Sequence, residues 1–128
     1  MARQLVPANT PWESHLCYSR CVRAGNFIAV SQTSAVDSNG TIQGGDDPYL
    51  QAVYALKNVE AALVAVGSSL ADVIRTRIYL AKLKDWKEIG RAHAEAFHNV
   101  RPATSIIEVP MVSRDILVEF EIDAVIDR

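Results

Sequence analysis

The sequence has few cysteines, no excess of positive over negative charge, and no long hydrophobic run. Two cysteines in 128 residues leave no disulfide framework, and a chain of this length needs none to build a core. A formal net charge of -2 leaves no cluster of Lys and Arg to neutralise phosphates, which disfavours binding of RNA or DNA. No apolar run is long enough to span a membrane.

The cysteines and histidines also lack the spacing of a disulfide or a metal site. Cys17 and Cys21 are four residues apart. A strand predicted over residues 16–22 would place both on one face, too far apart along the strand to bond. Ligand spacing is equally missing among the three histidines, His15, His93 and His98. We therefore expect reduced cysteines and no metal.

Composition and length place the chain among ordinary globular proteins. Hydrophobic residues make up 49% and charged residues 22%, so a disordered or fibrous class is disfavoured. We expect one domain over residues 1–128 with a single core. Residues 1–11 carry one basic residue, Arg3, and no apolar segment of signal-peptide length. The expected location is therefore the cytoplasm.

The first half of the chain predicts a hairpin followed by a helix. Apolar runs over residues 16–22 and 27–31 flank a turn at Gly25. A tight turn is expected at residues 37–40, followed by a short edge strand at Thr41 and Ile42. Asp47 and Pro48 favour a helix start. One apolar stripe follows, made of Val53, Leu56, Val59, Leu63 and Val66.

The second half predicts three strands and a second helix. Strands are expected over residues 72–81, 104–109 and 117–125, with a helix that begins at Asp85. On that helix one face carries Trp86, Ile89, His93 and Phe97. The whole order is ββαβαββ, with both helices on one side of a mixed sheet. The sequence therefore predicts an α+β fold of two layers.

The face of the sheet that the helices leave uncovered is predicted to be charged. In residues 72–81, alternation places Ile74, Thr76, Ile78 and Leu80 on one face and Val73, Arg75, Arg77 and Tyr79 on the other. The last strand alternates apolar residues with Glu119, Glu121 and Asp123. Opposite charges on neighbouring strands would pair. We hypothesise that subunits associate over this face, with ligand clefts between them.

Residues 101–109 join a basic corner to an apolar run of β type. Pro102 fixes its own φ and pushes Arg101 out of the α region, so the preceding helix must end and a strand begin. The Arg101 guanidinium would then lie beside the hydroxyls of Thr104 and Ser105. A rigid cation with two hydroxyls suits a small carboxylate. The alternative is a helix-to-strand connection with a solvated arginine.

Several short motifs follow one another along nearly the whole chain. They are Tyr18-Ser19-Arg20, residues 25–31, Gly44-Gly45-Asp46, residues 67–80, Asp85-Trp86, Ala96-Phe97, residues 101–105, and residues 118–121 with Ala124-Val125. Each is weak alone, but their order and spacing are specific. Together they resemble the YjgF/RidA family of reactive intermediate deaminases, also labelled L-PSP endoribonucleases.

The resemblance implies a chorismate-mutase-like fold, a homotrimer and three clefts between subunits. It also implies hydrolysis of enamines or 2-imino acids to 2-keto acids and ammonia, with neither metal nor cofactor. In that family an Arg directly after Pro-Ala grips the substrate carboxylate, a Glu in the last strand positions or activates water, and a Tyr near the start lines the cleft. The tyrosine corresponds to Tyr18 and the glutamate to Glu119.

The sequence departs from the family pattern at two positions. Thr104 occupies the place of the arginine, and a single neutral hydrogen bond is weaker than a bidentate ionic clamp by about a few kcal/mol. Gln32 stands where the family usually has Gly, so a larger amide projects toward the cleft. The missing cation would come from Arg101, with Arg20, Arg77 or Arg91 as further candidates. Alternatively, the ligand lacks the usual carboxylate geometry.

Two functions from different classes follow. The first is an enamine or imine hydrolase that releases ammonia, with Glu119 as general base, Thr104, Ser105 and Gln32 near the ligand, and a substrate that differs from the archetype. The second is a binder of small metabolites without turnover. Pairing of Glu119 with Arg75 or Arg77 would make it a poor base, so that pairing discriminates the two. Ribonuclease activity conflicts with the net acidity, and chorismate mutase would share only the fold.

Overall fold

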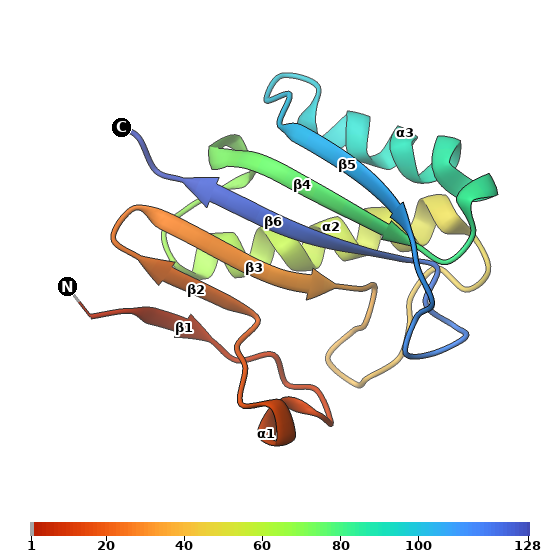
Figure 1. Cartoon of the computed structure of the whole chain (residues 1–128), viewed down its shortest axis with the longest axis horizontal. Coiled ribbons are helices and arrows are strands. Elements are labelled where there is room, and N and C mark those ends of the chain that lie inside the picture. The colour runs from red at the N-terminus through yellow and green to blue at the C-terminus, as the bar shows by residue number, and fades with distance from the viewer. Residues whose placement is uncertain (1) are drawn as a thin grey trace.

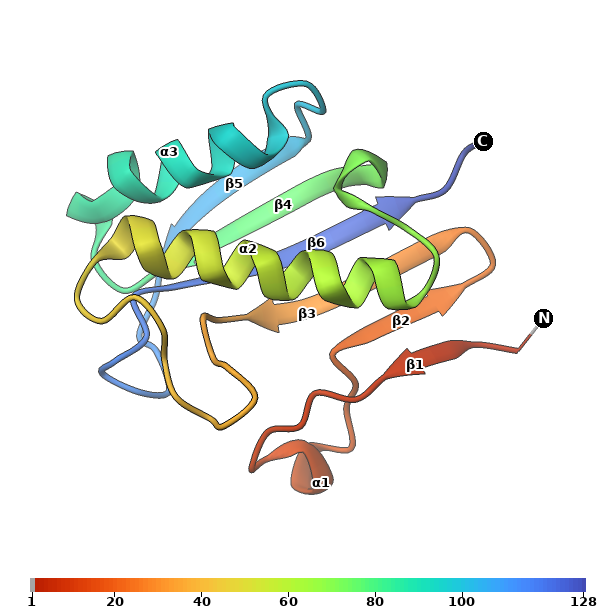
Figure 2. The same ribbon diagram turned by 180° about the vertical axis from the view of Figure 1, so that it is seen from behind.

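A single twisted sheet with two long helices on one face forms the molecule (Figures 1 and 2). The computed structural model describes residues 2–128. The strands, in the order β1-β2-β3-β6-β4-β5, are β1 (Gln4–Val6), β2 (Cys21–Ala24), β3 (Phe27–Thr33), β6 (Val118–Val125), β4 (Val73–Leu80) and β5 (Ala103–Glu108). Only β4 and β5 run parallel among these pairs. The helices are α1 (Glu13–Leu16), α2 (Pro48–Ala65) and α3 (Trp86–Phe97).

This architecture confirms the predicted α+β fold with both long helices on one side of a mixed sheet. Figure 2, seen from the helix side, shows α2 crossing in front of the centre of the sheet and α3 lying in front of β5. The predicted order ββαβαββ is present. At the N-terminal end the structure adds the edge strand β1 and the short helix α1 to that order.

The predicted strand over residues 16–22 is wrong in its position. Helix α1 ends at Leu16, Cys17 has a left-handed φ of 57°, and β2 begins only at Cys21. The side chain of Glu13 accepts hydrogen bonds from the backbone amides of Ala8 and Asn9. These local bonds favour a helical turn over an early strand. Cys17 is therefore exposed outside the sheet, whereas Cys21 is buried.

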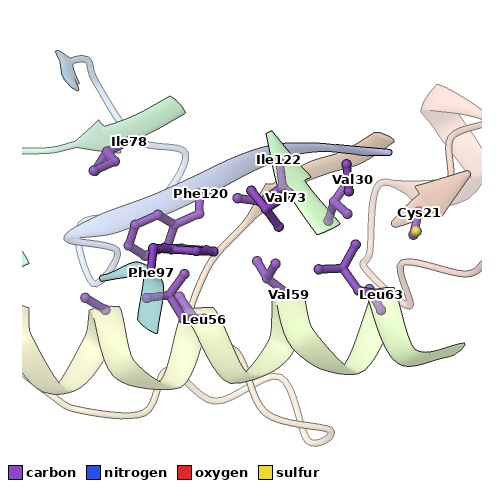
Figure 3. Close-up of a cluster of buried hydrophobic side chains, with 14 of the residues drawn as sticks. Cys21, Val30, Leu56, Val59, Leu63, Val73, Ile78, Phe97, Phe120 and Ile122 are labelled. Carbon is purple, nitrogen blue, oxygen red and sulfur yellow. The ribbon is translucent and has the colours of Figure 1, made fainter. Parts of the chain in front are cut away.

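Helix α2 begins as the sequence predicts. Asp47 is the N-cap, and its carboxylate accepts hydrogen bonds from the amides of Tyr49 and Leu50 at 2.9 and 3.2 Å. Pro48 occupies the first helical position, where its missing N–H costs nothing. The predicted stripe packs against the sheet, and Figure 3 shows Leu56, Val59 and Leu63 facing the strands. Most of that stripe is buried, namely Leu56, Val59, Leu63 and Val66.

The core lies between α2, α3 and the central strands. Every second residue of β6 is fully buried, from Val118 to Ala124, as the alternation predicts. Figure 3 shows Phe120 and Phe97 packed above α2. Strand β4 departs from the predicted faces at its start. The pairing with β6 shifts between Val73 and Arg75, so Val73 is buried and Ile74 is 49% exposed. This irregularity turns Ile74 away from the core.

Two smaller predictions are corrected. Thr41 and Ile42 do not form an edge strand, because only an isolated bridge joins Ile42 to Val36. Asp85 is the N-cap of α3, but its side chain makes no capping hydrogen bond. A 3-10 turn over Leu83–Asp85 precedes the helix and replaces the simple cap.

The uncovered face of the sheet carries a row of ion pairs. Arg75 lies 3.5 Å from Asp123, and Arg77 lies 3.3 Å from Glu121 and 3.6 Å from Asp123. Strands β4 and β6 are neighbours, so the predicted pairing of opposite charges is confirmed. Glu119 is not part of this row, because its partner across the strands is Tyr79.

Candidate functional site

A groove of about 1300 Å³ opens at the end of the sheet where β3 ends and β6 begins. Its walls come from the segment around α1, the loop between β3 and α2, and the loop over residues 110–116. Figure 1 shows these three segments gathered below and to the right of the sheet. The groove is lined by three of the predicted site residues, Tyr18, Gln32 and Glu119.

Glu119 is a half-buried carboxylate that lines the groove. Its Oε1 accepts a hydrogen bond of 3.1 Å from Nε2 of Gln32. Burial raises the pKa of Glu119, whereas the charge of Arg20 and the Gln32 hydrogen bond act in the opposite direction. Glu119 forms no ion pair with any residue in the range 2–128. A carboxylate in this state can accept a proton from water.

Arg20 is the cation that the structure places beside Glu119 in the groove. Its Nη1 atom donates to Oγ of Ser31 at 2.7 Å, to the carbonyl of Gln32 at 2.6 Å and to Oγ1 of Thr33 at 3.3 Å. These acceptors all belong to the last three residues of strand β3, where the pairing with β6 becomes irregular. The guanidinium is therefore fixed in position by one nitrogen.

Tyr18 lines the groove next to Arg20. Its hydroxyl is 2.7 Å from Oγ1 of Thr10, so the ring is attached to the segment that forms one wall. The Arg20 guanidinium carbon lies 6.0 Å from the centre of this ring. That distance is at the outer limit of a cation–π contact. The ring and the guanidinium therefore lie close together in the lining of the groove.

The corner at Arg101 lies at the other end of the sheet. Arg101 leaves α3 with a left-handed φ of 55°, and its amide donates to the carbonyl of Phe97 at 2.9 Å. The side chain is exposed. In Figure 1 this connection lies at the top of β5, away from the loop over residues 110–116 that borders the groove. In one chain Arg101 therefore does not reach Glu119.

Thr104 and Ser105 lie on opposite faces of β5. Ser105 is paired with Arg77 and Thr104 with Thr76. Because Thr76 is fully buried and Arg77 lies on the uncovered face, Thr104 points toward the helices and Ser105 toward the uncovered face. Neither residue lines the groove of its own chain.

Thr104 begins a chain of polar contacts that ends in the core. Its Oγ1 is 2.8 Å from Oγ1 of Thr76, which is 2.8 Å from Nε2 of His93. Burial lowers the pKa of His93, and its ring packs against Phe97 at 4.7 Å. Sequence reasoning placed His93 on the apolar face of a helix without this partner. Thr76 carried no signal, because it alternates with apolar residues like a core position.

The predicted site residues thus form two groups. Tyr18, Gln32 and Glu119 meet in the groove, while Arg101, Thr104 and Ser105 lie along the other edge of the sheet. The contribution of Arg20 was foreseen only as one of several further cations. No pattern in the sequence shows that the end of β3 would hold it. Within residues 2–128, no group of three or more His, Cys, Asp or Glu side chains is arranged to hold a metal ion.

Fold and groove together define an α+β protein of the chorismate-mutase-like class, with a half-buried carboxylate in a polar groove. The chain belongs to the YjgF/RidA family. The family model described as Endoribonuclease L-PSP matches residues 9–126. None of the helices in residues 2–128 has the length and apolar character needed to cross a membrane.

Three relatives show the range of similarity. Rv2704 from Mycobacterium tuberculosis, a member of the YjgF/YER057c/UK114 family, is 40% identical with a TM-score of 0.87, over 98% of this chain and 100% of that one. The 3-aminoacrylate deaminase RutC of Acinetobacter baylyi is 30% identical over 115 residues, which are 90% of each chain. TdcF of E. coli, crystallised with bound serine, is 27% identical with a TM-score of 0.79, over 96% of this chain and 94% of that one.

Proposed function

We propose that the protein hydrolyses a small enamine or imine and releases ammonia. The observation that supports this most directly is the state of Glu119. Arg75 and Arg77 pair with Asp123 and Glu121 instead, so the Glu119 carboxylate remains available in the groove. Burial raises its pKa toward the range in which a carboxyl group works as a base and then as an acid.

The chemistry needs one group that moves a proton twice. An enamine first tautomerises to an imine, with its carbon gaining a proton and its nitrogen losing one. Water then adds to the C=N carbon while Glu119 accepts a proton from that water, the π pair of C=N moves to nitrogen, and Glu119 passes the proton on to that nitrogen. In the second step Glu119 takes the hydroxyl proton and gives it to the amine as C=O forms, the C–N bond breaks and ammonia leaves. The sum is imine plus water to ketone plus ammonia, and Glu119 returns to its first state.

Two relatives support this reaction class. The relative from Acinetobacter baylyi is named for deamination of 3-aminoacrylate, which carries an enamine nitrogen and a carboxylate. The E. coli relative holds serine, a small molecule with an amine and a carboxylate. Both ligands are of a size that the groove accommodates. The substrate of this chain is accordingly proposed to be a small amine-derived metabolite.

The site is proposed to be completed between subunits of a homotrimer. The uncovered sheet face carries exposed apolar side chains, including Leu5 and Phe27, beside the charged row. Covering it with a second chain would bury them. The same contact would bring Arg101 and Ser105 of one chain toward Tyr18, Gln32 and Glu119 of another, with Thr104 beside them at the exposed edge of β5. The two groups of predicted site residues would then meet at each cleft.

A binder without turnover is the second candidate, and Thr104 is the observation that favours it. Its hydroxyl is already engaged with Thr76 and with the carbonyl of Pro102 at 3.0 Å. A threonine in that state offers a ligand less than an arginine would. Such a protein would hold a metabolite in the groove but release no ammonia.

The test is ammonia release from purified protein with a panel of enamines and imines generated in place. One set carries a carboxylate and a second set resembles aminomuconate. We expect turnover above the buffer rate and a loss of about 100-fold or more in Glu119→Gln. Lys87→Gln, which removes one charge on the exposed side of α3, serves as the control and keeps full activity. A rate equal to that of buffer across the panel would exclude the hydrolase and leave the binder.

A further inference from the structure

We propose that Arg20 recognises the carboxylate of the ligand and so replaces the arginine that position 104 lacks. The inference deepens the proposed function, because it names the charged end of the molecule that Glu119 would act on. It assigns the ligand to the class of small carboxylates with an amine-derived carbon next to or near the acid group. Arg20 is the only basic residue among the described residues that line the groove.

The hydrogen bonds of Arg20 leave one edge of its guanidinium, the edge with Nε and Nη2, free to bind a ligand. The contacts to Ser31, Gln32 and Thr33 all go through Nη1. In residues 2–128, Nε and Nη2 of Arg20 donate to no other protein group. These two nitrogens point the same way on one edge of the planar group. Such an edge forms two parallel hydrogen bonds to a carboxylate.

The position of Arg20 is also fixed in advance, which lowers the cost of ligand binding. Its backbone amide donates to Val6 at 2.8 Å, and its carbonyl accepts from the amide of Ser31 at 2.9 Å. The side chain is half-buried between these strands. A guanidinium held at both its backbone and one nitrogen loses little further freedom on binding.

The other arginines of the sheet and helices are already engaged. Arg23 donates to the carbonyls of Gly25 and Val66 at 2.8 and 2.7 Å. Arg75 and Arg77 are in the charged row. On α3, Arg91 pairs with Glu88, and its guanidinium carbon lies 3.5 Å from the centre of the Tyr49 ring of α2. None of these lines the groove.

Glu119 and Arg20 together would orient the ligand. A carboxylate bound to Arg20 offsets the charge that now lowers the pKa of Glu119, and it adds a negative charge nearby. Both effects favour the protonated form of Glu119. Binding of an acid should therefore be accompanied by greater proton uptake than binding of its neutral ester.

The experiment compares pyruvate with methyl pyruvate, an acid and its neutral ester, by calorimetric binding in two buffers of different ionisation enthalpy. We expect the wild-type protein to bind the acid at least 10-fold more tightly than the ester. Arg20→Gln should reduce this preference to within about 2-fold, while Arg20→Lys should keep part of it, since a point charge remains. Lys87→Gln should keep the full preference.

Two outcomes would overturn the proposal: an acid preference that persists in Arg20→Gln, or no acid preference in the wild-type protein. Arg20 also connects β-strands, so each variant is first checked for wild-type far-UV circular dichroism and a cooperative melt. Arg20→Lys keeps the charge if Arg20→Gln unfolds.

Glu119→Gln separates the proposed hydrolase activity from the proposed carboxylate site at Arg20. If ammonia release is absent in every protein but the preference depends on Arg20, the hydrolase fails and the carboxylate site stands.

Discussion

At the residue scale, one register decides which carboxylate of β6 is available for chemistry. Glu119, Glu121 and Asp123 alternate identically along the strand. Across from them on β4 lie Tyr79, Arg77 and Arg75 in that order. The two arginines engage Glu121 and Asp123 and leave the carboxylate opposite the tyrosine without an ion pair. The same side-chain type therefore has a structural role at one position and a candidate catalytic role two residues away.

This difference predicts that Glu119→Gln stabilises the fold at neutral pH. The pKa of Glu119 is raised by burial above its ordinary value of 4.5, so its contribution to stability is complete below that pH. The contribution is lost as pH rises through the folded-state pKa. An uncharged Gln avoids this loss, and we expect a rise in Tm on the order of a few degrees at pH 7.5. Thermal melts followed by circular dichroism at pH 7.5 and pH 4 measure it.

Glu121→Gln is the matched control on the same strand. It removes the negative charge that pairs with Arg77 at 3.3 Å and that accepts from the Tyr79 hydroxyl at 3.0 Å. We expect no gain in Tm from it at pH 7.5. An equal gain in both variants would show that general relief of negative charge, rather than the burial of Glu119, is responsible. A Glu119→Gln gain that persists undiminished at pH 4 would also contradict the prediction.

At the scale of elements, hydrogen bonds connect two loops around the groove to the start of α2. Gln51 on that helix is fully buried, and its Nε2 donates to the carbonyls of Gly45 and Asp115 at 2.8 and 2.7 Å. Its Oε1 accepts from the amide of Leu117 at 2.9 Å. One side chain thus joins the loop before α2 to the loop before β6. Both loops border the groove.

Gly44 lies so close to the start of α2 that no side chain fits there. Its φ is 96°, and an added Cβ would lie 2.6 Å from the backbone nitrogen of Gln51. Gly45 has a φ of 54° and open space at its Cβ. We expect Gly44→Ala to cost about 2–5 kcal/mol of unfolding free energy, because the helix backbone must move. Gly45→Ala should cost only about 1–2 kcal/mol for the left-handed conformation. Urea unfolding of both variants gives the comparison, and equal costs would contradict it.

At the scale of the whole molecule, the two groups of site residues lie apart in one chain. Glu119 and its neighbours occupy the groove, while Thr104 and Ser105 lie on the far edge strand β5. If the groups meet only between subunits, a variant defective in one group can complement a variant defective in the other. Such complementation is specific to sites shared by two chains.

We predict that mixing Glu119→Gln with Thr104→Val restores activity that neither variant has alone. The two are unfolded and refolded together in equal amounts so that subunits exchange at random. About one quarter of the clefts then combine an intact Glu119 with an intact Thr104 from the neighbouring chain. Ammonia release should approach that fraction of the wild-type rate. Separately refolded samples that are mixed afterwards without subunit exchange are the control. Absence of any restoration would place both residues in the same chain's site or exclude Thr104 from it.

Much of the fold follows from the sequence alone. The alternation from Val118 to Ala124, the cap at Asp47 and the turn at Gly25 each depend on local geometry, and each was predicted in its observed place. The N-terminal segment was not, because the carboxylate of Glu13 accepts hydrogen bonds from the amides of Ala8 and Asn9 and so favours a helical turn at the start of the apolar run. Propensity carries no information on such bonds.

The site depended more on tertiary structure. The sequence identified Glu119 and Tyr18 as candidates and determined that one face of the sheet would be charged. Only the pairing of β4 with β6 decided that Glu119, and not Glu121, has no arginine opposite it. Only the end of β3, with the oxygens of Ser31, Gln32 and Thr33, held Arg20 at the groove. Alternation fixes the face of a side chain, but the partner across the sheet depends on register, which residues far apart in the chain set together.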